Sequence, residues 1–320
     1  EALRLTEEAH GPEQVQVSRA LDTLGNAYTC RGDHDKAKAA FARALEVRLR
    51  SLGPKHPVVA HSYRNLAMAS NYTGEYRNAA EGNARARAIY LATVGRGHLH
   101  TGVTLHNEGL ARRLLGELDA ALALHREAEE VFAAVDGKRE ANLASTYNQL
   151  GADHWMLGDT ATARVYAEKA LALRRAAHGP THSAVGEDLL LLARLDLEDK
   201  RAADALARAR EAAGLFESVQ VRPVLKARAS TLEGEALLMQ GDAASALPPL
   251  TRAREILELH PTWEPYSLAE VRLAMAEARA RTGGPDVRPL AEAALAFFAA
   301  RPDAAARRST ARARALLTPR

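Results

Sequence analysis

The sequence is poor in cysteine and aromatic residues, and it has no long hydrophobic run. Cys30 is the single cysteine in 320 residues, so an internal disulfide is impossible and nothing indicates an oxidising compartment. No apolar stretch approaches the roughly 18–20 residues that span a bilayer, and no signal-peptide pattern is present, so we expect a cytoplasmic protein without membrane contact. Aromatic residues make up 5% of a chain that is 47% hydrophobic. Leucine, alanine and valine must therefore build most of the core, which favours closely packed helices.

The motifs of catalysis and cofactor binding are also missing. The chain contains no HExxH or paired Cys-His spacing, no GxSxG, and no kinase catalytic-loop string. Gly95-Arg96-Gly97 follows a helical pattern and lacks the Lys-Ser/Thr of a phosphate-binding loop, so it predicts a helix end. Three of the twelve histidines, His56, His98 and His182, recur at one repeat position. We expect no catalytic residue, no metal and no cofactor.

Charge of neither sign dominates. The 43 basic and 40 acidic residues leave a formal net charge of +3, and opposite charges alternate along the helical segments. This pattern is typical of the solvated faces of amphipathic helices, and it lacks the aromatic-basic interleaving of single-strand binders. We therefore expect no nucleic-acid partner.

Glycine sets a period. One series recurs every 42 residues at Gly32, Gly74, Gly116 and Gly158, after which Glu198-Asp199-Lys200 takes the place of the glycine. A second series, with the same spacing, consists of Gly11, Gly53, Gly95, Gly137 and Gly179. Glycine commonly closes helices in the left-handed conformation. The two series predict two helices in each period.

Small residues recur in phase within both predicted helices. The first helices carry Gly25, Ala67, Gly109, Gly151, Ala193, Gly234 and Ala276, and the second helices carry alanine at two fixed positions. Only small side chains fit where two paired helices cross closely. The sequence therefore predicts an all-α fold, a right-handed α-solenoid of about seven stacked antiparallel helix pairs.

These features resemble the tetratricopeptide repeat. The resemblance rests on Leu24-Gly25, Tyr28, Gly32-Asp33, Ala37, Phe41 and Ala44-Leu45. The 42-residue period, the loop Leu52-Gly53-Pro54-Lys55-His56-Pro57 and the string Asn65-Leu66-Ala67 resemble the kinesin-light-chain subclass. The resemblance implies a scaffold that binds a peptide or protein segment in a concave groove.

The register divides the chain into four parts. Residues 1–10 match the second helix of a truncated preceding repeat, which suggests excision from a longer protein. Regular repeats occupy 11–217, two degenerate helix pairs occupy 218–300, and 301–320 form a C-terminal capping helix. Arg301, Arg307, Arg308, Arg312 and Arg314 give this last helix a basic face, which we interpret as solvated, with an acidic partner or nucleic acid as the alternative.

The resemblance places the first helices along the concave side. Counting from each small residue then selects the inward positions, where amide groups can bind a peptide backbone and Met and Trp side chains offer adaptable apolar contact. The predicted partner-binding residues are Asn26, Arg64, Asn65, Met68, Asn71, His106, Asn107, Arg113, Asn148, Gln149 and Trp155. Asn26 and Asn65 match a carboxylate clamp known in the family, but its basic positions fall on Asp22, Val103 and Asn107, so we expect no such clamp.

The best functional hypothesis is an interaction module that binds a peptide or partner protein. The segment from Tyr266 to Ala278 resembles the tails of bacterial serine/threonine kinases that carry tetratricopeptide repeats. Arginine far outnumbers lysine and alanine is abundant, which is typical of a GC-rich bacterial gene. We therefore expect a regulatory or substrate-recruiting region of a larger signalling protein. The alternative is a sensory ligand- or peptide-binding domain of a transcription regulator.

Overall fold

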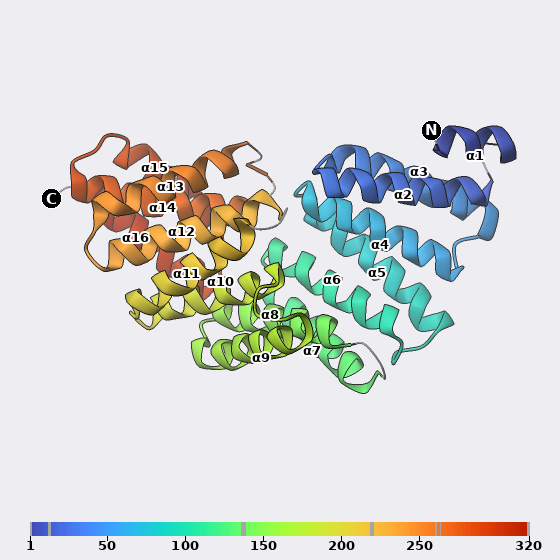
Figure 1. Cartoon of the computed structure of the whole chain (residues 1–320), viewed down its shortest axis with the longest axis horizontal. Helices are drawn as coiled ribbons and strands as arrows, with labels where there is room; N and C mark the ends of the chain where they lie inside the picture. The colour runs from blue at the N-terminus through green and yellow to red at the C-terminus, as the bar shows by residue number, and fades with distance from the viewer. Residues whose placement is uncertain are drawn as a thin grey trace. The chain divides into compact units, whose positions relative to one another are not determined.

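The computed structural model describes residues 2–11, 14–135, 139–217, 221–259, 261–262 and 264–318 (Figure 1). Within these ranges the chain forms sixteen α-helices and no strand. The helices are α1 (Ala2–His10), α2 (Val15–Arg31), α3 (His34–Leu52), α4 (Pro57–Tyr72), α5 (Tyr76–Thr93), α6 (Leu99–Leu115), α7 (Leu118–Ala134), α8 (Glu140–Leu157), α9 (Thr160–His178), α10 (Ser183–Glu198), α11 (Ala202–Glu217), α12 (Pro223–Met239), α13 (Ala243–Glu258), α14 (Pro265–Thr282), α15 (Val287–Ala299) and α16 (Ala304–Leu317). Gly137, one of the predicted turn glycines, lies outside the described residues.

The helices pack as consecutive pairs, from α2 with α3 to α14 with α15 (Figure 1). Each pair also packs on the next one within its unit, which confirms the predicted α-solenoid of seven antiparallel pairs. The chain divides into an N-terminal unit, Glu1–Arg139, and a C-terminal unit, Glu140–Arg320. The N-terminal unit holds α1 and three pairs, and the C-terminal unit holds four pairs and α16.

Glycines of the first series close helices as the period predicts, whereas Gly53 and Gly179 of the second series follow α3 and α9 with positive φ but ψ of 164° and 162°, outside the left-handed helical region. Gly32 and Gly116 follow α2 and α6 with φ of 80° and 87°, in the left-handed region that costs glycine no strain. Lys200, which replaces the glycine after α10, also has a positive φ of 60°. The backbone therefore keeps the same turn at this point, although the Cβ atom of Lys200 makes this backbone conformation strained.

The recurring histidines cap helix N-termini. His56, His98 and His182 each accept a hydrogen bond on Nδ1 from the backbone N–H two residues later, at 3.1, 3.2 and 3.1 Å. An N-cap side chain satisfies one of the amide groups that has no partner within the helix. Accepting through Nδ1 requires the proton on Nε2. This role explains why histidine recurs at this position of the repeat.

Small residues mark the helix crossings, and at some crossings they leave room for a large side chain of the partner helix. A Cβ atom added to Gly25 would lie 2.5 Å from the ring of Phe41, and one added to Gly234 would lie 2.4 Å from Cγ of Leu250. In the pair that carries Ala193, the corresponding second-helix residue is the small Ala209, and both are fully buried. At Gly25 and Gly234 a large side chain of the partner helix thus fills the space left by the missing one, whereas the Ala193–Ala209 crossing is formed by two small side chains.

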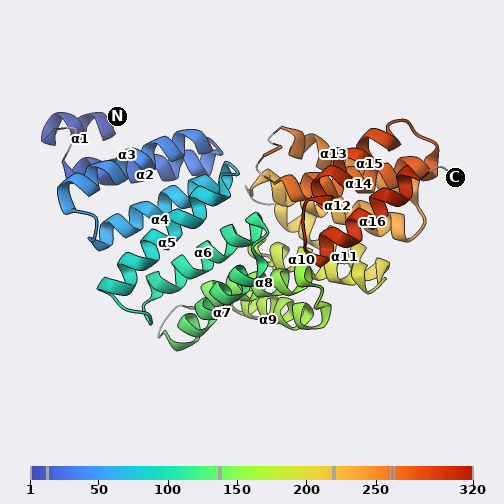
Figure 2. The same ribbon diagram turned by 180° about the vertical axis from the view of Figure 1, so that it is seen from behind.

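The first helices line the inner side of each unit. In the N-terminal unit α4 packs on α6, and in the C-terminal unit α8, α10, α12 and α14 follow one another in contact. The last helix, α16, packs on α15 and α14 and also on α8, the first helix of that unit (Figure 2). A Cβ atom added to Gly158 would lie 3.2 Å from Cβ of Ala304. The first helices of the C-terminal unit, with α16, thus close on themselves.

Candidate functional site: the inner helix faces

The inner face of the N-terminal unit holds eight of the predicted partner-binding residues, on α2, α4 and α6. Asn26 on α2 is exposed, and Arg64, Met68, Asn71, His106, Asn107 and Arg113 are half-buried. Asn65 is buried. Half-buried polar groups on adjoining helices are positioned by their neighbours and remain accessible at the surface.

Arg64 is the central cation of this face. Its Nη2 lies 3.0 Å from Nδ1 of His61, and it makes no ion pair among the described residues. Burial and the Arg64 charge lower the pKa of His61, and the same two causes lower the pKa of His100 on α6. Near neutral pH, Arg64 is thus a guanidinium flanked by two neutral imidazoles, which favours a carboxylate ligand.

Asn65 belongs to a buried network that joins three helices. Its Nδ2 donates to Oδ1 of Asp22 at 3.4 Å and lies 3.2 Å from Nε2 of His61. The other Asp22 oxygen is 2.5 Å from Nη2 of Arg48, which also donates to Ser18 and Ser62. The Asn65 amide therefore fixes the spacing of α2 and α4, and it orients His61 beneath Arg64.

Met68 and Asn71, both on α4, lie in different surroundings. Met68 packs against the cluster of Ala37, Phe41 and Ala69, which anchors its stem. The side-chain oxygen of Asn71 is buried and has no hydrogen-bond partner within the described part of the chain. A buried amide oxygen without a partner is costly, and a donor brought by a ligand would relieve that cost.

The predicted residues on α6 extend this face by one helix. His106 and Asn107 occupy the repeat positions of Arg64 and Asn65, and the His106 ring centroid lies 5.6 Å from that of His125. His125 Nε2 donates to the His106 carbonyl at 3.2 Å. This bond ties α6 to α7 and holds the inner face of α6 in place.

The C-terminal unit holds the other three predicted residues, all on α8. Asn148 donates to Oδ1 of Asp188 at 2.8 Å, within a network that includes the buried Arg174. Burial raises the pKa of Asp188 to about 6, against the opposing charge of Arg174. Gln149 is half-buried. Trp155 donates from Nε1 to Glu198 at 2.9 Å, and the Arg194 guanidinium lies 5.6 Å from its ring centroid.

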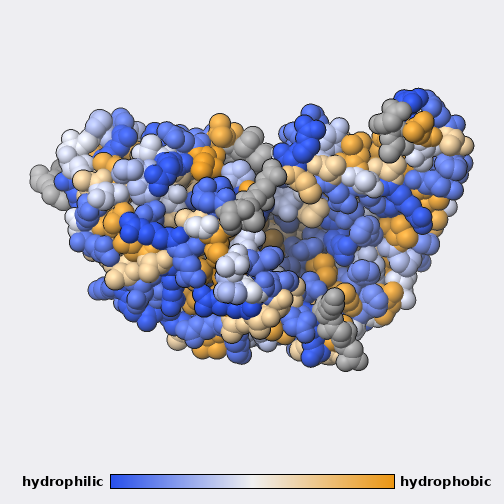
Figure 3. All heavy atoms as spheres, in the orientation of Figure 1, coloured by the Kyte–Doolittle hydropathy of each residue, from blue (hydrophilic) through white to orange (hydrophobic). Residues whose placement is uncertain are grey.

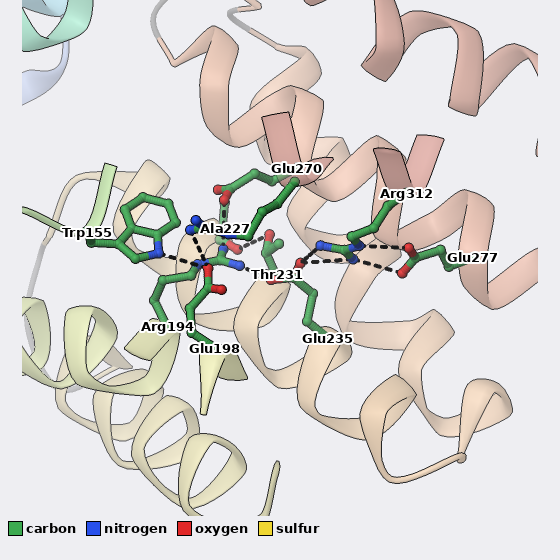
Figure 4. A network of polar contacts seen from close by, with 10 residues as sticks. Trp155, Arg194, Glu198, Ala227, Thr231, Glu235, Glu270, Glu277 and Arg312 are labelled. Atoms are coloured by element: carbon green, nitrogen blue, oxygen red, sulfur yellow. Dashed lines mark hydrogen bonds and ion pairs between the residues drawn. The ribbon is translucent and has the colours of Figure 1, made fainter. Parts of the chain in front are cut away.

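The sequence interpretation missed an acidic inner face, which we define as Glu198, Glu235, Glu270 and Glu277 (Figure 4). Arg194 lies between two of these glutamates, with Nη1 at 2.5 Å from Glu235 and Nη2 at 3.0 Å from Glu270. Burial raises the pKa of Glu270 to about 7, although the neighbouring Arg194 opposes this. A signal was present, because Arg194, Glu235 and Glu277 each directly follow a small residue of the phased series.

The basic face of the last helix differs from the prediction. Arg307 and Arg314 are exposed, as expected of a solvated helix. Arg308 instead forms an ion pair with Glu198 at 2.8 Å, and Arg312 pairs with Glu277 at 2.8 Å and Glu235 at 3.4 Å. Two of the five arginines thus point into the unit and bind its acidic inner face.

Within the described residues, no group of three or more His, Cys, Asp or Glu side chains has a metal-binding arrangement, and no helix is long and apolar enough to cross a membrane. On the face seen in Figure 3, hydrophobic residues lie in small groups among hydrophilic ones. A shallow pocket between α3, α4 and α5, lined by residues such as Lys38, Tyr63 and Arg85, contains none of the predicted partner-binding residues.

Solved structures with a similar fold include two Rap proteins and BtubC (BKLC). A Rap conjugation gene regulator of plasmid pLS20, in complex with the Phr* peptide, matches 97% of this chain and 76% of its own, with 15% identity and a TM-score of 0.68. The apo form of RapI matches 94% and 98%, with 15% identity and a TM-score of 0.64. BtubC (BKLC) from P. vanneervenii matches 71% and 91%, with 17% identity and a TM-score of 0.55.

A family model agrees with the repeat architecture. No curated protein matches the chain. The tetratricopeptide repeat model matches residues 1–50, 24–91 and 142–218, which together cover just over half of the sequence. The helix pairs, the closing glycines and the small residues at the crossings lie where this repeat requires them. The chain therefore belongs to the tetratricopeptide repeat family.

Proposed function

We propose that this chain is a protein-interaction module whose N-terminal unit binds an acidic partner segment along the inner face of α2, α4 and α6. The observation that carries the proposal is Arg64, a half-buried guanidinium without a carboxylate partner among the described residues. A ligand carboxylate would complete a charge-assisted pair there.

The surrounding groups suit an extended peptide. Asn26, Asn107 and the unpartnered oxygen of Asn71 offer donors and acceptors that a peptide backbone can use without regard to its side chains. Met68 supplies an apolar contact, and its stem is held by Phe41. The buried network around Asn65 and Arg48 holds α2 and α4 rigid, so little conformational entropy is lost when a ligand binds.

We place the module within a larger bacterial signalling protein, acting in the cytoplasm. The resemblance of the segment from Tyr266 to Ala278 to kinase-linked repeat regions supports a kinase parent, and the arginine-rich, alanine-rich composition supports a bacterial one. In that setting the module recruits substrates or regulators, and catalysis is left to other domains.

A second candidate is the peptide-sensing domain of a transcription regulator. It is favoured by the similar fold of the Rap conjugation gene regulator, whose structure contains the Phr* peptide. The two candidates differ in ligand. A recruiting module binds a segment of a larger protein, whereas a sensor binds a free peptide that raises the melting temperature by mass action.

The test is a binding screen with labelled acidic, neutral and basic peptide pools, read by fluorescence anisotropy at low and high salt. We expect the acidic pool to bind best, and we expect Arg64→Glu combined with Asn107→Ala to weaken its binding about tenfold or more, since a charge-assisted contact is lost and a repulsion added. Arg77→Glu, an exposed change on α5, is the control with equal charge. Equal affinity of both variants, with helicity and melting temperature preserved, would show that the inner face is not the binding surface.

A further inference from the structure

In the C-terminal unit, α16 is held by ion pairs with side chains of other helices, as a bound ligand helix would be. α16 lies against α8, α14 and α15, and its Arg308 forms an ion pair with Glu198. Its Arg312 reaches Glu235 and Glu277 of the acidic inner face (Figure 4). The Arg312 guanidinium is bidentate on Glu277, with Nε at 2.9 Å and Nη2 at 2.8 Å from the two carboxylate oxygens. The pair Arg308–Glu198 joins positions that are 110 residues apart in the sequence.

The face beneath α16 is acidic without it. Glu198, Glu235, Glu270 and Glu277 come from three helices; Arg194 lies between two of them, and the charge of Arg228 also acts on Glu270. Arg312 and Arg308 bring this set of groups close to neutrality. The side chains of Glu235 and Glu277 are only 6% and 15% exposed, so their charges are poorly solvated and gain most from a cationic partner.

The apolar part of the contact requires small side chains. Ala306 and Ala313 of α16 are fully buried in a cluster with Leu273 and Phe298, and Ala304 approaches Gly158. Larger residues would not fit this close approach. The occupant is thereby specified: an amphipathic helix with two arginines one turn apart and alanine-sized residues beside them.

The attachment of α16 is of a kind that a competitor can replace. Arg308 and Arg312 remain 38% and 41% exposed, so both ion pairs are open to screening by salt. Four residues, from Ala300 to Asp303, connect α15 to α16, and this short tether keeps the local concentration of α16 high.

We propose that the acidic inner face of the C-terminal unit is a second docking site, which takes an arginine-bearing amphipathic helix of a partner protein and is held closed by α16 in the free chain. The site is separate from the one proposed on the N-terminal unit, and it has the opposite charge preference. Partner binding requires α16 to leave, so the two helices compete for Glu235 and Glu277.

The test uses the full chain and a labelled peptide of residues 303–318 as the probe. Arg308→Glu with Arg312→Glu should release α16 and allow the peptide to bind at least about tenfold more tightly than it binds the wild type, because the tethered competitor is removed. Arg307→Glu with Arg314→Glu, the same charge change on the exposed side of α16, should bind the peptide no better than the wild type. Adding Glu235→Gln and Glu277→Gln to the released variant should abolish binding.

Equal peptide binding by the released variant and the control would overturn the proposal, as would binding that survives the loss of both glutamates. If the released variant does not fold, the peptide is added in large excess to the wild-type chain and amide exchange of α16 is followed. Faster exchange in residues 304–317 supports competition, and unchanged exchange contradicts it. Formation of a dimer by the released variant without peptide would assign the site to a second copy of this chain and would likewise contradict a separate partner.

Discussion

Alanine in place of Gly234 gives the sharpest test of the helix crossings. In an open helix, Gly→Ala stabilises by about 0.5–1 kcal/mol because alanine loses less backbone entropy on folding. At Gly234 the new Cβ would lie 2.4 Å from Cγ and 2.6 Å from Cδ2 of Leu250, which is fully buried. Carbon atoms prefer about 3.5–4.0 Å, so Leu250 must move within a filled core, at a cost of roughly 1–3 kcal/mol. We expect a net destabilisation of about 1–2 kcal/mol.

Gly214→Ala is the matched control for this change. Gly214 lies in α11, and a Cβ added there would have no neighbour within 4 Å, so only the entropic gain remains. Trp155 lies on α8 in the C-terminal unit, and its fluorescence during urea unfolding therefore reports on this unit. Leu250→Ala should lower the free energy of unfolding by about 1–2 kcal/mol less in the Gly234→Ala background than in the wild type. Equal effects of the two glycine changes, or strict additivity with Leu250→Ala, would refute the crossing geometry.

The remaining predictions concern one strained turn and one buried acid. Lys200→Gly should raise stability by up to about 1 kcal/mol, because Lys200 has a φ of 60° and glycine adopts that conformation without strain; a lower melting temperature would contradict this. Glu270, with a pKa of about 7 against roughly 4.3 in the unfolded chain, keeps a proton on folding, so stability should fall as pH rises between these values. Glu270→Gln should therefore match the wild type near pH 4 and exceed its stability by about 2 kcal/mol at pH 8 in urea unfolding, and an equal difference at both pH values would contradict this.

The periodic residues allowed most of the fold to be predicted from the sequence. The contacts of the turn glycines, such as Gly32 and Gly116, and of the small residues at the crossings lie within one repeat or between neighbouring repeats. The same local geometry therefore recurs in each copy of the repeat. Lys200 shows that glycine positions alone do not reveal every turn, because here the surrounding structure imposes a positive φ on a residue that disfavours it. The histidine series likewise repeats because an N-cap is a local requirement.

The C-terminal unit could not be predicted in the same way. Whether Arg308 meets solvent or Glu198 depends on how tightly successive pairs curve, and that curvature accumulates over four pairs. Trp155, Arg194 and Glu235, which lie on successive first helices, meet in one network through Glu198 and the Arg194 guanidinium. The repeat register does not show whether such a position faces an open surface or another helix.

The contact between α16 and α8 changes how the C-terminal unit responds to unfolding stress. In a linear array each pair is supported only by its neighbours, so the ends fray first and stability is nearly a sum of local contributions. Here the two ends support each other through Ala304 and Gly158, which are far apart in the sequence. The unit therefore gains the cooperativity of a globular domain, at the expense of slower folding through a distant contact. A partner that displaces α16 would remove this mutual support and return the unit to a linear array with fraying ends. Binding at the α16 end would then lower the local stability of α8 at the other end.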